Sequence, residues 1–185
     1  MGTHLSKLYP VVTALLLTVW NSLPGQAQTS LDEMMEALRT APPAEATRIS
    51  REIEREWAKS GSTSLDMLLR RGREAMAEDR LTVAIEHLTA LTDHAPDFAE
   101  GWHARATAYY MKGLYGPALS DLQRALILNP ENYNALFGLG VMLQEFGDDV
   151  RAEQAFQQVI DLHPGHENAS NALKLLQSKG IGRAL

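Results

Sequence analysis

Histidine and carboxylate side chains near residue 165 are the first candidates for chemistry in this 185-residue chain. His163 and His166 flank a Pro-Gly pair, and Glu167 follows directly. Imidazole and carboxylate are ligands that zinc accepts, but a zinc site needs three or four converging ligands. The Pro-Gly pair also marks a turn between helical segments. We therefore expect no metal at this place and no cofactor elsewhere in the chain.

Other reactive residue types do not form a catalytic arrangement. The chain has no Cys, which excludes a thiolate metal site and a disulfide framework within it. No Ser stands in the glycine-flanked elbow of a nucleophilic hydrolase. Gly138-Leu139-Gly140 follows no strand, so it does not predict a phosphate-binding loop. These observations predict that the protein is not an enzyme.

Composition favours a folded helical protein. The hydrophobic fraction of 45% is that of an ordinary globular chain, and aromatic residues make up only 6%. Abundant Ala, Leu and Glu favour helices over sheets. The formal net charge of −6 lacks the basic excess that nucleic-acid binding requires. We expect helices throughout and no nucleic-acid partner.

A 34-residue period organises most of the chain. Pro96, Pro130 and Pro164 stand 34 residues apart, and the same residue types precede each of them. The recurring small residues are Gly72, Ala106 and Gly140, the turn residues are Asp79, Gly113 and Gly147, and the large apolar residues are Leu88, Leu122 and Phe156. A small residue lets two antiparallel helices approach, a glycine ends the first helix, and the proline ends the second. Each unit is therefore a helix pair that buries its faces by stacking on its neighbours.

This pattern resembles the tetratricopeptide repeat (TPR) family. Repeat two is the best copy, with Trp102, Ala106, Tyr109, Ala118, Leu122, Ala125 and Pro130 all in place. Repeat one departs from the pattern at Arg71 and Ala75. The resemblance implies an all-α, right-handed α-solenoid of about ten helices in stacked helical hairpins. Its three TPR units are 65–98, 99–132 and 133–166, and a C-terminal capping helix and tail follow at 167–185.

A helical hairpin outside the repeat pattern precedes the array. Apolar residues recur at helical spacing on both sides of Pro42-Pro43, which predicts a non-standard hairpin within 28–64. We expect it to stack on repeat one as an N-terminal cap. Arg51 and Arg55 alternate with acidic residues there, which is typical of a solvated helix face. Asp97 and Glu100 are spaced as a capping box for the first helix of repeat two.

The resemblance also implies where a partner would bind. In TPR arrays the first helix of each repeat lines a concave groove that holds extended or helical peptides. The positions expected to contact the partner are Leu69, Arg70, Arg73, Met76, His103, Thr107, Tyr110, Met111, Phe137, Val141 and Gln144. Some family members grip chaperone tails with a carboxylate clamp of Lys and Asn. Those places hold Leu69, Arg73 and Ala104 here, so the clamp is not carried over.

The N-terminal residues have the pattern of a secretory signal peptide. Lys7 precedes the apolar run 11–20, which is too short to span a bilayer, and small residues follow at Gly25 and Ala27. We expect segment 1–27 to be cleaved between Ala27 and Gln28, with no stable membrane insertion afterwards. An uncleaved N-terminal anchor is the alternative. The chain is thus expected to be exported, and periplasmic in a Gram-negative bacterium.

These features together predict a non-catalytic module for protein–protein interaction. The expected role is an adaptor or assembly factor of the cell envelope that binds a peptide or protein partner in its groove. Two alternatives stay open. The chain could self-associate as a structural scaffold, with its tail at 181–185 or another copy filling the groove, or it could be an accessory subunit of an envelope enzyme complex.

Overall fold

The computed structural model describes residues 25–183, and nearly all of the predicted signal segment 1–27 lies outside them. Nine α-helices and no strand make up this described part of the chain. The helices are α1 (Gly25–Thr40), α2 (Pro43–Trp57), α3 (Thr63–Ala77), α4 (Leu81–His94), α5 (Ala99–Met111), α6 (Tyr115–Leu128), α7 (Tyr133–Glu145), α8 (Asp149–Leu162) and α9 (Glu167–Arg183). Within residues 25–183, no helix combines the length and the apolar character that crossing a membrane requires.

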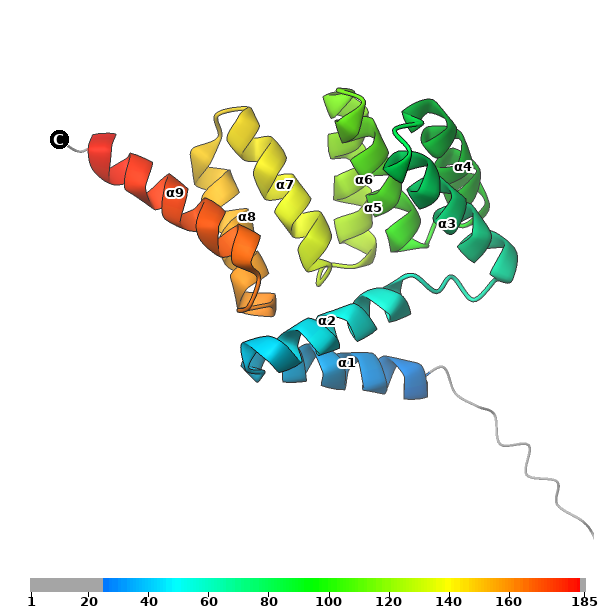
Figure 1. Ribbon diagram of the computed structural model, residues 1–185, viewed down its shortest axis with the longest axis horizontal. Helices are drawn as coiled ribbons and strands as arrows, with labels where there is room; N and C mark the ends of the chain where they lie inside the picture. The colour runs from blue at the N-terminus through cyan, green and yellow to red at the C-terminus, as the bar shows by residue number, and fades with distance from the viewer. Residues whose placement is uncertain (1–24, 184–185) are drawn as a thin grey trace, which may run out of the picture.

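Three antiparallel helix pairs, α3–α4, α5–α6 and α7–α8, stack side by side at the expected 34-residue period (Figure 1). Each pair turns at a residue in the left-handed conformation: Asp79 has φ 55°, Gly113 has φ 76° and Gly147 has φ 78°. The next residue then donates its amide to a carbonyl five residues back, as Leu114 does to Tyr109 at 2.8 Å. This geometry ends the first helix of each pair and confirms the predicted turns.

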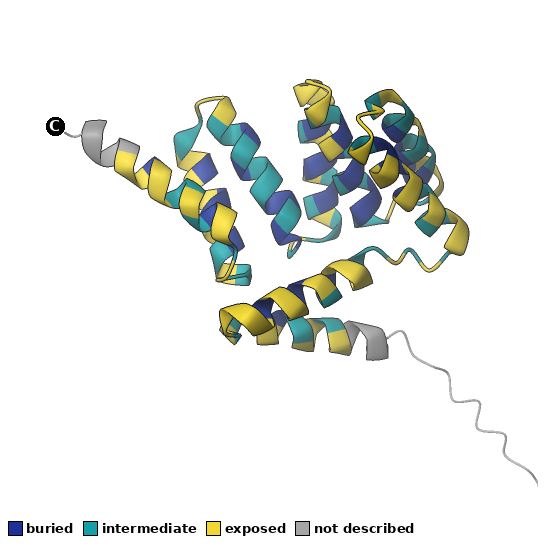
Figure 2. Cartoon of the chain, in the orientation of Figure 1, coloured by how far each residue is buried: buried dark blue, intermediate teal, exposed yellow. Residues whose placement is uncertain are grey.

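The small residues lie where the two helices of a pair cross, as the period predicts. A methyl group on Gly140 would stand 2.5 Å from Cε1 of Phe156, and one on Gly72 would stand 2.5 Å from Cγ of Leu88. Phe156 and Leu88 are both fully buried. Within repeats one and three, the two helices are therefore too close for a side chain at Gly72 or Gly140. Figure 2 shows buried residues along the faces where the helices meet.

The N-terminal hairpin packs against repeat three, so its expected position on repeat one is wrong. Met35, Leu38, Ile49 and Ile53 of α1 and α2 share one buried cluster with Tyr133, Phe156 and other residues of α7 and α8. The hairpin lies along one edge of the array, and the linker that joins it to α3 contains Gly61 at φ 81° (Figure 1). The array offers apolar side chains on the edge of repeat three, and the hairpin covers them.

Two further details concern the ends of helices. The predicted capping box is not formed, because α5 begins after Phe98 without a side-chain cap and Glu100 points into the interior. In contrast, the Asn132 side chain caps α7 by accepting a hydrogen bond from the Ala135 amide at 3.0 Å.

At the C-terminal end of the array, α9 packs on α8 through Ala169 and Leu176, which confirms the expected capping helix.

Candidate peptide-binding groove

An apolar cavity of about 250 Å³ lies between α5 and α7, the first helices of repeats two and three. Five of the residues expected in the groove line it together: His103, Thr107, Tyr110, Phe137 and Val141. They meet because residues three and four apart share one face of a helix, and the two faces oppose each other. The rest of the lining consists of Ala106, Leu122, Asn134, Gly138 and Met142. The cavity is shaped for an apolar side chain.

Other residues expected in the groove lie elsewhere. The assignment of Leu69 is wrong, because its side chain is 2% exposed within the core shared by repeats one and two. Met76 packs half-buried against the same cluster. Arg70 is exposed and donates a hydrogen bond to Glu74 at 2.9 Å. Met111 is 48% exposed at the end of α5, and Gln144 is half-buried near the end of α7; neither lines the cavity.

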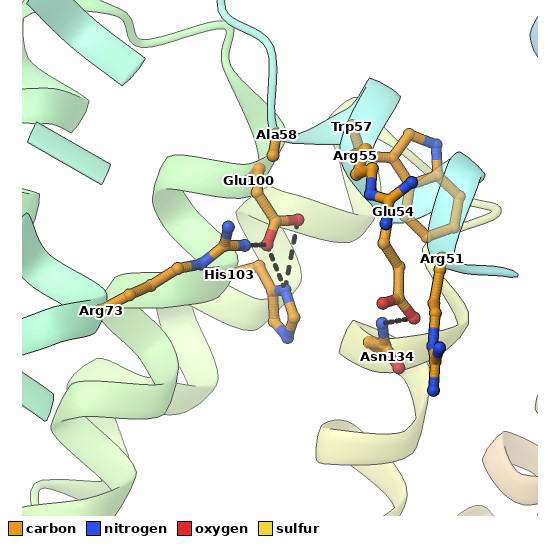
Figure 3. Close-up of a pocket in the computed structure, with 9 residues that line it drawn as sticks. All are labelled: Arg51, Glu54, Arg55, Trp57, Ala58, Arg73, Glu100, His103 and Asn134. Carbon is orange, nitrogen blue, oxygen red and sulfur yellow. Dashed lines mark hydrogen bonds and ion pairs between the residues drawn. The ribbon is translucent and has the colours of Figure 1, made fainter. Parts of the chain in front are cut away.

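A second cavity, of about 360 Å³, opens between the hairpin and the concave face of the repeats (Figure 3). The hairpin side consists of Arg51, Glu54, Arg55, Trp57 and Ala58, and the repeats contribute Arg73, Glu100, His103 and Asn134. His103 and Asn134 border both cavities, so the two form one continuous surface. Of these hairpin residues, the charged Arg51, Glu54 and Arg55 are the ones that the sequence predicts on a solvated face. No local pattern reveals this placement, since it depends on where the hairpin docks.

Glu100 is the most buried charged group of this surface. Its side chain is 8% exposed, and its carboxylate forms an ion pair with Arg73 of repeat one. His103 Nδ1 lies 3.2 Å from Oε1, and the Asn132 amide donates to Oε2 at 3.2 Å. Burial alone would raise the pKa of Glu100, but His103, Arg73 and Asn132 outweigh burial and lower it. The carboxylate is therefore ionised and joins α3, α5 and the capping residue of α7.

The hairpin docks through an aromatic contact and a shared carboxylate. The rings of Trp57 and Tyr133 lie 5.0 Å apart at 52°. The Tyr133 hydroxyl lies 3.2 Å from the Glu54 carboxylate, which also accepts a hydrogen bond from Asn134 at 3.0 Å. Burial, followed by the charge of Glu54, raises the pKa of Tyr133. Glu54 thus joins the hairpin to α7 although it is exposed, and Arg51, one turn earlier on α2, is also exposed at the cavity rim.

Comparison with known proteins identifies the repeats. The profile of the family described as "Tetratricopeptide repeat" matches residues 69–119 and 115–167, which together span more than half of the chain. The chain belongs to the tetratricopeptide repeat family. A TPR repeat-containing protein of Rhizobium etli is 31% identical over 153 residues, covering 82% of this chain and 75% of that protein. As a member of this family, the chain is a protein–protein interaction module.

Solved TPR structures agree with the fold. The TPR domain of Sgt2 from Aspergillus fumigatus has a TM-score of 0.61 and 26% identity, covering 66% of this chain and 82% of that domain. The first TPR of Spaghetti (RPAP3), bound to the HSP90 peptide SRMEEVD, also has a TM-score of 0.61, with 22% identity. It covers 63% of this chain and 93% of that one. The all-helical TPR stack predicted from the sequence is therefore confirmed.

Tyr110 connects the TPR groove to an aromatic edge. Its hydroxyl donates to Glu145 at 2.6 Å, and this hydrogen bond, together with burial, raises the pKa of Tyr110 to about 12. The Tyr110 ring lies 5.8 Å from Tyr115, whose ring lies 5.7 Å from Phe146. The hydrogen bond fixes Tyr110 against the wall of the apolar cavity, so this side of the groove is preformed.

The two histidines considered as metal ligands lie beneath the docked hairpin. His163 packs 5.0 Å from the Tyr133 ring, and His166 packs 5.0 Å from the Phe137 ring. His166 Nδ1 accepts the amide of Ala169 at 3.1 Å and so caps α9. Burial lowers the pKa of both histidines. Across the described residues 25–183, no three His, Cys, Asp or Glu side chains come together as metal ligands would.

Proposed function

We propose that this TPR protein is a non-catalytic adaptor or assembly factor of the cell envelope that binds a peptide or protein partner in its concave groove. The observation that carries the proposal is the apolar cavity between α5 and α7, which five of the expected contact residues line. A groove that exists before binding reduces the ordering cost of a flexible ligand. The first TPR of Spaghetti (RPAP3) is bound to a peptide, which supports peptide binding by this chain.

The envelope location rests on the signal-peptide pattern of residues 1–27. We expect a mature chain that begins at Gln28 in the periplasmic or secreted fraction. N-terminal sequencing of the protein recovered from each cell fraction tests this. An intact N-terminus found only with the membrane fraction would favour the uncleaved anchor instead, and an intact chain in the cytoplasm would contradict export.

A pull-down from envelope extract tests the binding function. Thr107 is exposed at the mouth of the apolar cavity, so Thr107→Arg places a long charged side chain in it without disturbing the core. Ser120→Arg is the matched control, because Ser120 is an exposed hydroxyl residue on α6 that does not line the cavity. We expect the parent and Ser120→Arg to capture a partner that Thr107→Arg does not capture. A partner retained by all three would place binding outside the groove.

Self-association is the second candidate, and one observation favours it. Met111, Leu114, Tyr115 and Phe146 are between 40% and 55% exposed at the turns of repeats two and three. Exposed apolar groups that lie together commonly mark interaction surfaces. Sedimentation equilibrium over a wide concentration range tests this alternative. A dimer that Phe146→Ser and Tyr115→Ser dissociate would favour a scaffold, and a monomer throughout would exclude it.

A further inference from the structure

Two arginines of the hairpin stand at the groove without a counter-ion. Arg51 and Arg55 are one helical turn apart on α2, both exposed, and both line the cavity between α2 and the repeats. Neither forms an ion pair within the described residues, whereas Arg48 on the same helix binds Glu52 at 2.8 Å. Their spacing of four residues places both on one face of α2, and this face borders the cavity.

The carboxylates of the same cavity are already satisfied. Glu100 accepts hydrogen bonds from Arg73, His103 and Asn132, and Glu54 accepts them from Tyr133 and Asn134. Figure 3 shows the Glu100 group and the Glu54 group on opposite sides of the cavity. The lining holds three arginines, Arg51, Arg55 and Arg73, against the two carboxylates, so its charge excluding His103 is +1 on a chain whose formal net charge is −6. A basic rim on an acidic protein favours an anionic ligand at this place.

The apolar cavity begins where the basic rim ends, because His103 and Asn134 border both. A peptide lying along the concave face would reach both in one extended conformation. Guanidinium groups bind carboxylates with paired, charge-assisted hydrogen bonds. Tyr110, Phe137 and Val141 provide the apolar contact for a neighbouring side chain.

We infer that the N-terminal hairpin is part of the binding site, and that Arg51 and Arg55 select an acidic peptide segment with an apolar residue beside its Asp or Glu side chains. The inference rests on the proposed function and adds the chemistry of the partner to it. The repeats do not supply this selectivity, since Leu69 is buried and Arg73 is paired with Glu100. A TPR array without the hairpin would keep the apolar cavity and lose the acidic preference.

Fluorescence anisotropy with three labelled peptides tests the inference on the full chain. The acidic probe is GSFEELDEG, the neutral probe GSFQQLNQG, and the third, GSSEESDEG, keeps the acids without the apolar residues. The variant is Arg51→Gln with Arg55→Gln. Arg48→Gln with Arg71→Gln is the charge-matched control, because both residues are exposed and neither lines the cavity. Circular dichroism confirms that each variant is folded.

We expect the acidic probe to bind the parent about tenfold more tightly than the neutral probe, as two exposed charge contacts provide. The double variant should lose that preference, and the control should retain it. Equal binding of the two probes, no binding of the acidic probe, or a preference that survives in the double variant would overturn the inference. Binding of the neutral probe alone would leave the proposed function standing, while tight binding of the third probe would count against the apolar groove.

A second copy of the chain is the competing occupant. Sedimentation equilibrium of the parent and the double variant at the anisotropy concentrations distinguishes it. A parent dimer that Arg51→Gln and Arg55→Gln dissociate would show that the arginines contact another copy, and would overturn the assignment to an acidic peptide. A parent that stays monomeric with the probe bound at a single site supports the assignment.

Discussion

Two glycines of α7 should respond in opposite directions to the same substitution. Gly140 and Gly138 lie two residues apart in one helix, where Gly→Ala normally stabilises by about 1 kcal/mol. A methyl group on Gly138 would meet Leu122 Cδ2 at 3.6 Å, which is ordinary contact. A methyl group on Gly140 would meet Phe156 at 2.5, 2.8 and 3.0 Å through three ring atoms. Only the substitution at Gly140 would overpack the core.

The size of the effect follows from the surroundings of Phe156. This ring is fully buried and lies 5.6 Å from the ring of Phe137, so it cannot turn aside freely. Overpacking in a closed core costs about 1–3 kcal/mol, from which the helical preference of Ala recovers about 1. We expect Gly140→Ala to lower the free energy of unfolding by about 1 kcal/mol, and Gly138→Ala to leave it unchanged or raise it by up to about 1 kcal/mol.

Urea unfolding followed by circular dichroism measures both variants in the parent, and measures Gly140→Ala also in a Phe156→Leu background. Repeat two already combines Ala106 with Leu122 in one buried cluster, so Ala and Leu are compatible at the equivalent crossing. Gly140→Ala should therefore be tolerated better in the Phe156→Leu background than in the parent. If Gly140→Ala stabilises the parent as much as Gly138→Ala does, the close crossing of α7 and α8 deduced here is wrong.

Three further predictions concern the groove and the hairpin. The lowered pKa of Glu100 means that its contribution to stability is present above the unfolded value of about 4.3 and is lost as the pH falls through the lower folded value. Glu100→Gln should thus be less stable than the parent at pH 7 and should lose less stability on acidification. Urea titrations of both proteins at pH 7 and at an acidic pH measure this. Trp57→Ala removes the ring that packs at a tilt against Tyr133 and should destabilise the docked hairpin by about 2 kcal/mol; hydrogen exchange should rise in α1 and α2 while α4 and α6 stay protected. Glu145→Gln replaces the charged acceptor of the hydrogen bond that, with burial, raises the pKa of Tyr110 to about 12, so NMR titration of the Tyr110 ring should give a lower pKa than in the parent; an unchanged value would contradict this role of the Glu145 carboxylate.

The repeats could be predicted from sequence because local rules determine them. A glycine after an amphipathic segment ends a helix, as Gly113 and Gly147 do, and a small residue is needed where the two helices of a pair cross closely. Neighbouring repeats then stack because each helix pair leaves an apolar face uncovered. Asp79 shows the limit of the glycine rule, since it adopts φ 55° without being glycine. The 34-residue phase identified this turn although the residue type alone did not.

The hairpin position and the capping of α5 depend on contacts that no local pattern contains. Glu100 has the spacing of a capping residue, yet Arg73 of α3, His103 of the same helix and Asn132 before α7 draw its carboxylate inward. Turning the carboxylate outward to cap α5 would break all three of these contacts, whereas an exposed cap contributes about 1 kcal/mol. The basic rim was missed for the same reason. Arg51 and Arg55 look like surface residues until the hairpin is placed against repeat three.

The docked hairpin has a consequence for how the groove works. Glu54 and Tyr133 lie 79 residues apart in the sequence and are joined across the array, so the hairpin links the start of repeat one to repeat three. An open solenoid can flex, because each repeat contacts only its neighbours. The link restricts that flexing and keeps the two cavities aligned before a ligand arrives, which reduces the ordering cost of binding. Loosening the hairpin with Ile53→Ala should therefore weaken binding of the acidic probe even though Ile53 is buried and lines neither cavity. Binding that is unaffected would show that the groove keeps its shape without a tightly docked hairpin.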